Sequence, residues 1–175
     1  MAKKVAVLAV DPVNGFGLFA YLETFFENGI SYRTFAVAEG TQIKTNSGVT
    51  LTVDDVVANL KGKEHTFDAL VFACGDAIPQ FAANAGKSYN QEMLSVMKTF
   101  ADSGKLLIGH CGAGVLFDSI ASLKGKRVAL HPYVKNAVKN VIGTDQLVEI
   151  DGNLYTAQTE HALAALLPEV VKALK

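Results

Sequence analysis

LLIGHCGAG, the sequence of residues 106–114, decides the fold class because it places a cysteine between a strand pattern and a helix pattern. The strand pattern covers Leu106–Gly109, and a helical pattern follows from Val115. Glycines beside Cys111 allow the sharp turn that this junction needs and leave room above the sulfur. The turn directs the side chain outward, and the positive end of a helix dipole behind it favours the thiolate. We therefore predict that Cys111 is the chemical centre of the protein, against the alternative of a small buried hydrophobe.

The composition excludes several classes of protein. The chain has 175 residues, of which 50% are hydrophobic and 19% charged, so we expect one globular domain over residues 1–175. A formal net charge of -1 without a basic stripe gives no general attraction for nucleic acid or anionic membranes. The apolar run Val5–Val10 is too short for a signal peptide or a membrane span. The two cysteines form neither a disulfide framework nor a metal-binding spacing, so we expect a cytoplasmic protein that requires no metal or cofactor.

Strand patterns alternate with helix patterns along the chain. The predicted strands are Lys4–Val10, Ser31–Val37, Phe67–Ala73, Leu106–Gly109, Arg127–Leu130, Gln146–Ile150 and Leu154–Ala157, with a hairpin over Thr41–Val53. The predicted helices begin at Leu18, Asp54, Ser88, Val115 and Thr159, and Pro168 either kinks the last one or begins a final short turn. This alternation predicts a three-layer α/β/α sandwich around a mostly parallel, doubly wound sheet.

Ligands of such sheets bind beyond the carboxyl ends of the strands, where the strand order reverses. Three glycine-containing segments follow strands and are expected to meet there: residues 11–17, 74–80 and 109–114. The expected pocket residues within them, beside the cysteine turn itself, are Asp11, Gly15, Gly17, Cys74, Asp76 and Gln80. The two aspartates either orient a ligand or cap a helix.

Further groups in these segments are candidates for chemistry. His110 either acts as the base for Cys111 or points away from it, as neighbouring residues of a turn do. His131 either turns toward the site or only begins a loop. Cys74 either lies close enough to Cys111 for thiol exchange or fills a strand end.

Backbone amides near the cysteine are candidates for binding negative charge. The N–H groups of Gly75 and Gly112 are expected to face an oxyanion formed above the sulfur. The turn that continues through Ala113 and Gly114 before a helix is suited to hold a phosphate or carboxylate, although it matches neither the P-loop nor the dinucleotide fingerprint. His65, His161 and Asp118 are expected to be solvated.

Several segments together resemble the ThiJ/PfpI superfamily, the group around intracellular protease I and the Parkinson-associated deglycase. FDALVFACG (67–75) resembles the family strand FDALVLPGG, and GKLLIGHCG (104–112) resembles its GKPVAAICHGP turn. LKGKRV (123–128) and VEIDGNL (148–154) are similar to the family segments LKGRKVT and VVDGNLIT. The resemblance implies a flavodoxin-like fold with Cys111 as its nucleophile-elbow cysteine, His131 near it, and a homodimer or higher homo-oligomer.

The chain departs from the family pattern at four places. The family glutamate in the first helix matches Gly17, and the histidine that protease-like members place after the cysteine is replaced by Gly112. Pro79-Gln80 stands where those members have an acidic residue, and Cys74 replaces the first glycine of the family's glycine pair. These changes remove groups that deprotonate and orient the thiol, so the resemblance does not transfer peptidase or deglycase activity directly.

Three classes of function follow. The favoured one is an enzyme in which Cys111 attacks a carbonyl group, as a cysteine hydrolase or a glyoxalase- or deglycase-like enzyme. The second is a non-catalytic module that binds a nucleotide or a flavin-like molecule in a crevice enlarged by Gly17. The third is a redox or stress-response protein in which Cys111, with or without Cys74, is oxidised reversibly.

Overall fold

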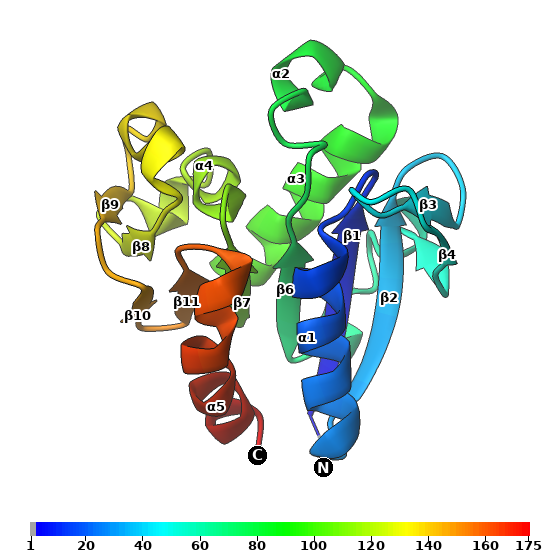
Figure 1. Ribbon diagram of the computed structural model, residues 1–175, viewed down its shortest axis with the longest axis horizontal. Coiled ribbons are helices and arrows are strands. Elements are labelled where there is room, and N and C mark those ends of the chain that lie inside the picture. The colour runs from blue at the N-terminus through cyan, green and yellow to red at the C-terminus, as the bar shows by residue number, and fades with distance from the viewer. Residues whose placement is uncertain (1–2) are drawn as a thin grey trace.

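A seven-stranded sheet lies between two layers of helices in the computed structural model, which describes residues 3–175 (Figure 1). The strand order is β10-β11-β7-β6-β1-β2-β5, and all neighbouring strands are parallel except β10 and β11. The strands of this sheet are β1 (Lys4–Val10), β2 (Ser31–Val37), β5 (Asp55–Val56), β6 (Ala69–Ala73), β7 (Leu106–His110), β10 (Val148–Asp151) and β11 (Leu154–Ala157). The predicted mostly parallel, doubly wound sheet is confirmed.

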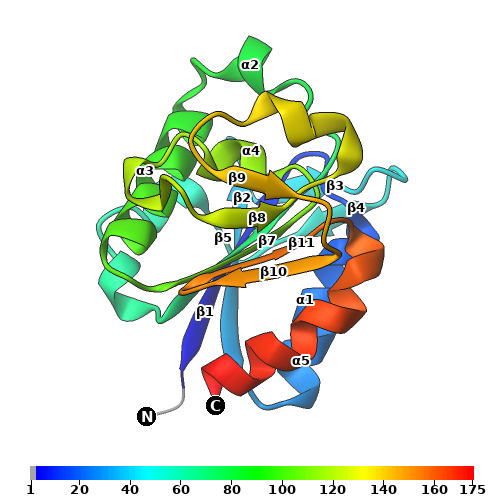
Figure 2. The same ribbon diagram turned by 90° about the vertical axis from the view of Figure 1, so that its left-hand side faces the viewer.

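The helices cover both faces of this sheet, as Figure 2 shows. On one side lie α1 (Gly15–Glu27) and α5 (Leu163–Leu174), which contact each other, and α3 (Ser88–Asp102) lies on the other. Shorter helices are α2 (Phe81–Asn84) and α4 (Ala113–Phe117). Two small sheets complete the fold: β3 (Gln42–Lys44) with β4 (Thr50–Thr52), and β8 (Arg127–Ala129) with β9 (Ile142–Thr144).

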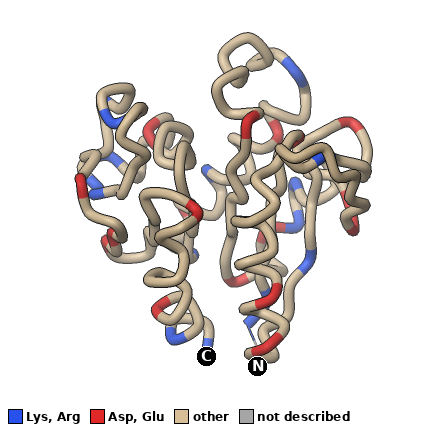
Figure 3. The backbone as a smooth tube through the Cα atoms, viewed as in Figure 1, with Lys and Arg blue, Asp and Glu red and all other residues tan. Residues whose placement is uncertain are grey.

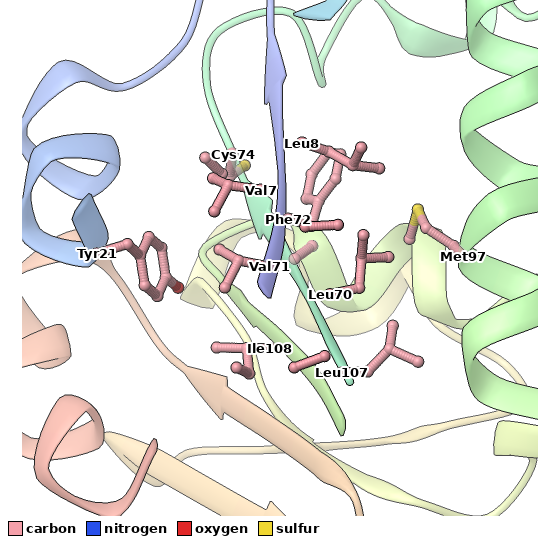
Figure 4. Close-up of a cluster of buried hydrophobic side chains, with 14 of the residues drawn as sticks. Val7, Leu8, Tyr21, Leu70, Val71, Phe72, Cys74, Met97, Leu107 and Ile108 are labelled. Carbon is pink, nitrogen blue, oxygen red and sulfur yellow. The ribbon is translucent and has the colours of Figure 1, made fainter. Parts of the chain in front are cut away.

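The central strands are apolar throughout because both of their faces are buried. Val7, Val71 and Ile108 share one register across β1, β6 and β7, and they point to the side of the sheet that Tyr21 of α1 covers (Figure 4). Their neighbours in sequence point the opposite way, toward Met97 of α3. The whole central region is solvent-inaccessible, so it holds the strand ends in fixed positions.

Two predicted elements differ from the structure. The predicted helix over Asp54–Leu60 is wrong: Asp55–Val56 pairs with β2, and only Val57–Asn59 forms a 3₁₀ turn. Asp54 accepts hydrogen bonds from Thr34 N–H and Oγ1–H (2.8 and 2.7 Å), so its carboxylate ties this segment to β2 and caps no helix. The last helix begins at Leu163 and contains Pro168, which therefore begins no separate turn.

The strand order reverses between β1 and β6. From β1 the chain crosses α1 to β2 on one side, whereas β6 pairs with the other edge of β1. Connections that leave β1 and β6 therefore run to opposite faces of the sheet, and a crevice opens above the carboxyl ends of these strands.

Positively and negatively charged residues are interspersed over the fold (Figure 3). Within residues 3–175, no helix combines the length and apolar character that crossing a membrane requires.

Asp118, predicted to be an exposed helix residue, anchors the segment that leads into β9. Its carboxylate accepts hydrogen bonds from the backbone N–H groups of Lys139 (3.0 Å), Asn140 (2.6 Å) and Val141 (2.8 Å). Partial burial acts to raise the pKa of this carboxyl, but the three N–H donors outweigh burial and hold its pKa below the usual value. The contribution of Asp118 to stability is therefore present above about pH 4 and is lost as the pH falls through the folded-state pKa.

We predict that Asp118→Ala lowers the free energy of unfolding at pH 7 by about 2 kcal/mol, because three backbone donors lose a charged acceptor. The difference from the wild type should shrink at pH 3, which urea denaturation at the two pH values will measure. Asp145→Ala is the matched control, since Asp145 is an exposed carboxylate whose ion pair with Lys135 is worth at most about 1 kcal/mol. Equal effects of the two substitutions would contradict the anchoring role of Asp118.

Candidate active site

Cys111 occupies a strained turn between β7 and α4. Its φ of 56° is the only positive φ of a non-glycine residue among residues 3–175. The Cys111 N–H donates to the carbonyl of Ala157 (3.1 Å), which ties the turn to the end of β11. A left-handed backbone at a non-glycine residue costs energy and persists only where the surrounding structure imposes it. Cys111 thus lies in a tight turn between a strand and a helix, where the sequence patterns placed it.

The elbow lies in a cleft of about 520 Å³ above the carboxyl ends of the strands. Asn14 enters it after β1, Cys74 and Asp76 after β6, Cys111 after β7, and Glu160 after β11. Apolar side chains form much of the remaining wall: Ile78, Pro79, Val115, Val134 and Ala137. Cys111 itself is partly exposed, so a molecule in this cleft reaches its sulfur.

Cys74 lies beside Cys111. Phe72 of β6 is opposite Gly109 of β7, so each cysteine stands two residues farther along its strand. The Gly112 N–H acts to lower the pKa of both thiols, and the Gly75 N–H acts to lower the pKa of Cys74. The amides that were expected to face an oxyanion thus lie against the thiols.

The pKa values of the two thiols are shifted in opposite directions. The hydrogen bond from the Cys74 thiol lowers the pKa of Cys111 most strongly, while burial and the charges of Glu160 and Asp76 oppose this. The same hydrogen bond and burial raise the pKa of Cys74 well above its ordinary value. The N-cap residue of α4 also acts to lower the pKa of Cys111 through the Gly112 N–H, although α4 spans only five residues.

His110 is buried and turned toward α1. The Tyr21 hydroxyl lies 3.2 Å from its Nδ1. Burial raises the pKa of Tyr21 well above its ordinary value, so the hydroxyl keeps its proton. Nε2 of the ring has no hydrogen-bond partner in the part of the chain that the structure describes. Burial lowers the pKa of His110 to about 4, against the charge of Glu160, so the ring is neutral near pH 7 and a weak base. We correct the general-base prediction to a structural role.

Gly17 makes room for this imidazole. A Cβ atom at position 17 would lie 2.6 Å from His110 Nε2, closer than real Cβ atoms approach. The expectation that Gly17 enlarges the crevice is therefore wrong, because the His110 ring fills the space. Two carboxylates, Asp76 and Glu160, line the cleft.

The other predicted residues separate into two groups. Asp76, Gly75 and His131 line the cleft with Cys111. Asp11 and Gln80 instead line a separate small cavity beside α2, and Gly15 packs on Thr45. The anion-binding prediction for Ala113 and Gly114 also needs correction, because both are buried and a Cβ at Gly114 would lie 2.3 Å from Leu130. Their small size lets α4 pack closely.

The sequence analysis missed three polar residues of the cleft. Asn14 caps α1 by accepting the Gly17 N–H (2.6 Å), and Asn46 accepts the Asp76 N–H (3.1 Å). Glu160 follows β11, so extending the strand-end argument to the last parallel strand would have found it. Asn46 reaches the cleft from the predicted β3–β4 hairpin, and no local sequence signal shows that this hairpin lies beside the cleft.

We predict that Tyr21→Phe lowers the free energy of unfolding by about 1–2 kcal/mol, because the buried His110 Nδ1 loses its hydrogen-bond partner. Tyr133→Phe is the matched control, since Tyr133 is 93% exposed and its hydroxyl can bond to water. Urea denaturation of both variants checks the prediction. Equal stability of the two variants would show that the Tyr21 hydroxyl does not stabilise the buried ring.

Comparison with known proteins agrees with this geometry. The chain is 59% identical over 175 residues, all of both chains, to the protein ppBat from Bacteroides thetaiotaomicron. A crystal structure of a protein from Bacteroides thetaiotaomicron, provisionally designated protease I, has a TM-score of 0.98 at 59% identity and covers 99% of this chain and 100% of that one.

More distant structures share the fold. A cysteine-to-alanine mutant of a DJ-1 superfamily protein from Salmonella typhimurium has a TM-score of 0.85 at 23% identity, covering 98% of this chain and 90% of that one. Oxidised DJ-1 from Toxoplasma gondii has a TM-score of 0.85 at 15% identity, covering 99% and 91%. The DJ-1/PfpI family model matches residues 3–173. The chain therefore belongs to the DJ-1/PfpI family.

Proposed function

We propose that the protein is a cysteine-dependent enzyme in which the Cys111 thiolate adds to the carbonyl carbon of a small, largely apolar molecule. The observation that carries this proposal is the Cys111 thiol of lowered pKa, held on a strained elbow and facing a cleft of about 520 Å³. A thiolate is the nucleophilic form of cysteine, so a lowered pKa increases its population at neutral pH.

The cleft favours a small carbonyl substrate over a polypeptide. Cys111 is only partly exposed, and Tyr133 and Val134 of the 3₁₀ turn Pro132–Ala137 rise beside it. The apolar wall suits an aldehyde with an alkyl or aryl group, as a glyoxalase- or deglycase-like enzyme would bind. Hydrolysis of peptides is the alternative that the designation of the Bacteroides relative favours.

His131 is the proposed proton donor. Its Nδ1 accepts the N–H of Tyr133 (3.3 Å), so in the neutral ring Nε2 carries the proton. When the thiolate attacks, a sulfur–carbon bond forms and the carbonyl π electrons move to oxygen. The Nε2–H of His131 then protonates this oxygen, and the proton lost by the thiol returns to the ring through solvent.

The proposed assembly is a homodimer or higher homo-oligomer, as is frequent in the family. Three aromatic side chains of α1, namely Phe16, Phe19 and Phe26, are exposed on this chain. Such exposed aromatic surface is typical of a protein–protein contact.

The proposed activity is tested with phenylglyoxal, an aromatic α-oxoaldehyde. We expect consumption of the aldehyde by the wild type, followed by its absorbance, and at least about a hundredfold slower consumption by Cys111→Ser, which lacks the nucleophile. His131→Gln should also slow the reaction. His65→Gln is its control, because His65 is exposed in the turn that precedes β6, at the opposite end of the strand from the cleft. Cleavage of a peptide library without aldehyde consumption would favour the hydrolase.

Activation of the thiol is tested separately by alkylation with iodoacetamide across pH. We expect the midpoint for Cys111 below about 8.5, the value for free cysteine. Cys74→Ala should move the midpoint upward, because it removes the strongest cause of the lowered pKa. A midpoint at or above the free value in the wild type would leave no reason to assign Cys111 as an activated nucleophile.

A further inference from the structure

The two cysteines lie at one turn of the cleft. A Cβ placed on Gly112, the residue after Cys111, would lie 3.6 Å from Cys74 Sγ, so the Cys74 sulfur packs against the turn that carries Cys111. Both residues also line the same cleft. A chain with only these two cysteines therefore holds both of them together at one site.

The backbone places the pair within reach of a disulfide. The cysteines follow adjacent parallel strands, and each lies two residues beyond the last paired residues, Phe72 and Gly109. Neighbouring strands lie about 4.8 Å apart. Disulfides usually join residues whose Cα atoms are about 4.4–6.8 Å apart. A bond between the two sulfurs therefore needs side-chain rotation and small backbone adjustments, and the sheet can stay intact.

We propose that Cys111 and Cys74 form a two-cysteine redox site that reduces a hydroperoxide and closes to an intramolecular disulfide. This proposal uses the same Cys111 sulfur as the proposed carbonyl chemistry, but it does not depend on that chemistry. Its new element is the role of Cys74 as the second, resolving thiol.

The exposure of the two cysteines determines which of them reacts with the peroxide first. Cys111 is partly exposed to the cleft, whereas Cys74 is buried beneath it, so a peroxide reaches Cys111 first. The lowered pKa of Cys111 and the raised pKa of Cys74 support the same order, because the thiolate attacks the peroxide. The largely apolar cleft wall suits an organic hydroperoxide with an alkyl or aryl group.

The hydroperoxide is the oxidant of the two thiols. The Cys111 thiolate attacks the outer peroxide oxygen, the O–O bond breaks, and the leaving alkoxide takes the proton that the thiol released, giving an alcohol. Cys111 becomes a sulfenic acid, and the peroxide gains two electrons. The Cys74 sulfur then attacks the Cys111 sulfur, the S–S bond forms, and hydroxide leaves with the Cys74 proton as water. Two thiols and one hydroperoxide yield one disulfide, one alcohol and one water.

The test treats the reduced wild-type protein with cumene hydroperoxide, unfolds it in iodoacetamide and measures its intact mass. We expect a monomer that has lost two hydrogens and carries no alkyl group, one cumyl alcohol for each disulfide, and full recovery of both thiols with dithiothreitol. Peptide mass spectrometry should identify a Cys74–Cys111 link. A wild type in which Cys111 gains oxygen atoms while Cys74 remains open to alkylation would overturn the proposal, as would a disulfide only between two chains.

The Cys74→Ala variant separates the resolving role from simple oxidation. Without the second thiol, the sulfenic acid of Cys111 cannot close to a disulfide, so dimedone should trap it. In the absence of dimedone, Cys111 of the variant should be oxidised to the sulfinic acid at peroxide doses that convert the wild type only to the disulfide. Cys74→Ser is a second variant of closer shape, and circular dichroism confirms that each variant is folded. Equal sulfinic acid formation in the wild type and both variants would reject Cys74 as the resolving thiol. Loss of aldehyde consumption in Cys111→Ser is measured independently, so the two proposals can fail separately.

Discussion

The parallel pairing of β6 with β7 is the constraint on which the site depends. This pairing brings Cys74 and Cys111 to the same edge of the sheet. The hydrogen bond from the Cys111 N–H to the carbonyl of Ala157 holds the end of β11 beside them. Because the apolar strands are buried on both faces, their ends cannot shift independently. The elbow at Cys111 can therefore keep a left-handed backbone that an isolated turn would relax.

The interior beside the elbow shows how this chain differs from the pattern of its family. The Gly17 position lacks the expected carboxyl group, and the ring of His110 occupies that space with Tyr21 as its partner. A neutral, buried imidazole cannot replace a carboxylate as a proton acceptor at neutral pH. The hydrogen bond from Cys74 to the elbow thiol gives a different means of lowering its pKa. The pKa of the Cys111 thiol is thus set largely by a second thiol, which is also its partner in the redox chemistry that we propose.

Polar groups around the cleft have roles that follow from their positions. Glu160 and Asp76 oppose ionisation of Cys111, so they moderate the acidity that Cys74 confers. Asn14 and Asn46 use their amides to hold the loops after β1 and β6. The cleft therefore combines a fixed polar edge with a largely apolar wall, which suits small molecules with one reactive polar group.

The alternation of strand and helix patterns by itself determined the fold class, because buried parallel strands need continuous apolar runs and helices need periodic ones. It also predicted the turn at Cys111, since glycines flank this cysteine between a strand pattern and a helix pattern. The local pattern predicted the wrong element at Asp54–Leu60. There the Asp54 carboxylate accepts a hydrogen bond from Thr34 of β2 and does not cap a helix.

Only the tertiary structure decided which residues meet Cys111. Asp11, Gly15 and Gln80 follow strands as Asp76 does, yet they face other parts of the molecule. The orientation of His110 toward Gly17 and the pairing of Cys74 with Cys111 depend on strand order and on packing between layers. Those contacts join residues far apart in the chain, and no local spacing encodes them. The sequence thus determined that Cys111 lies between a strand and a helix, and the packing of the sheet determined its neighbours.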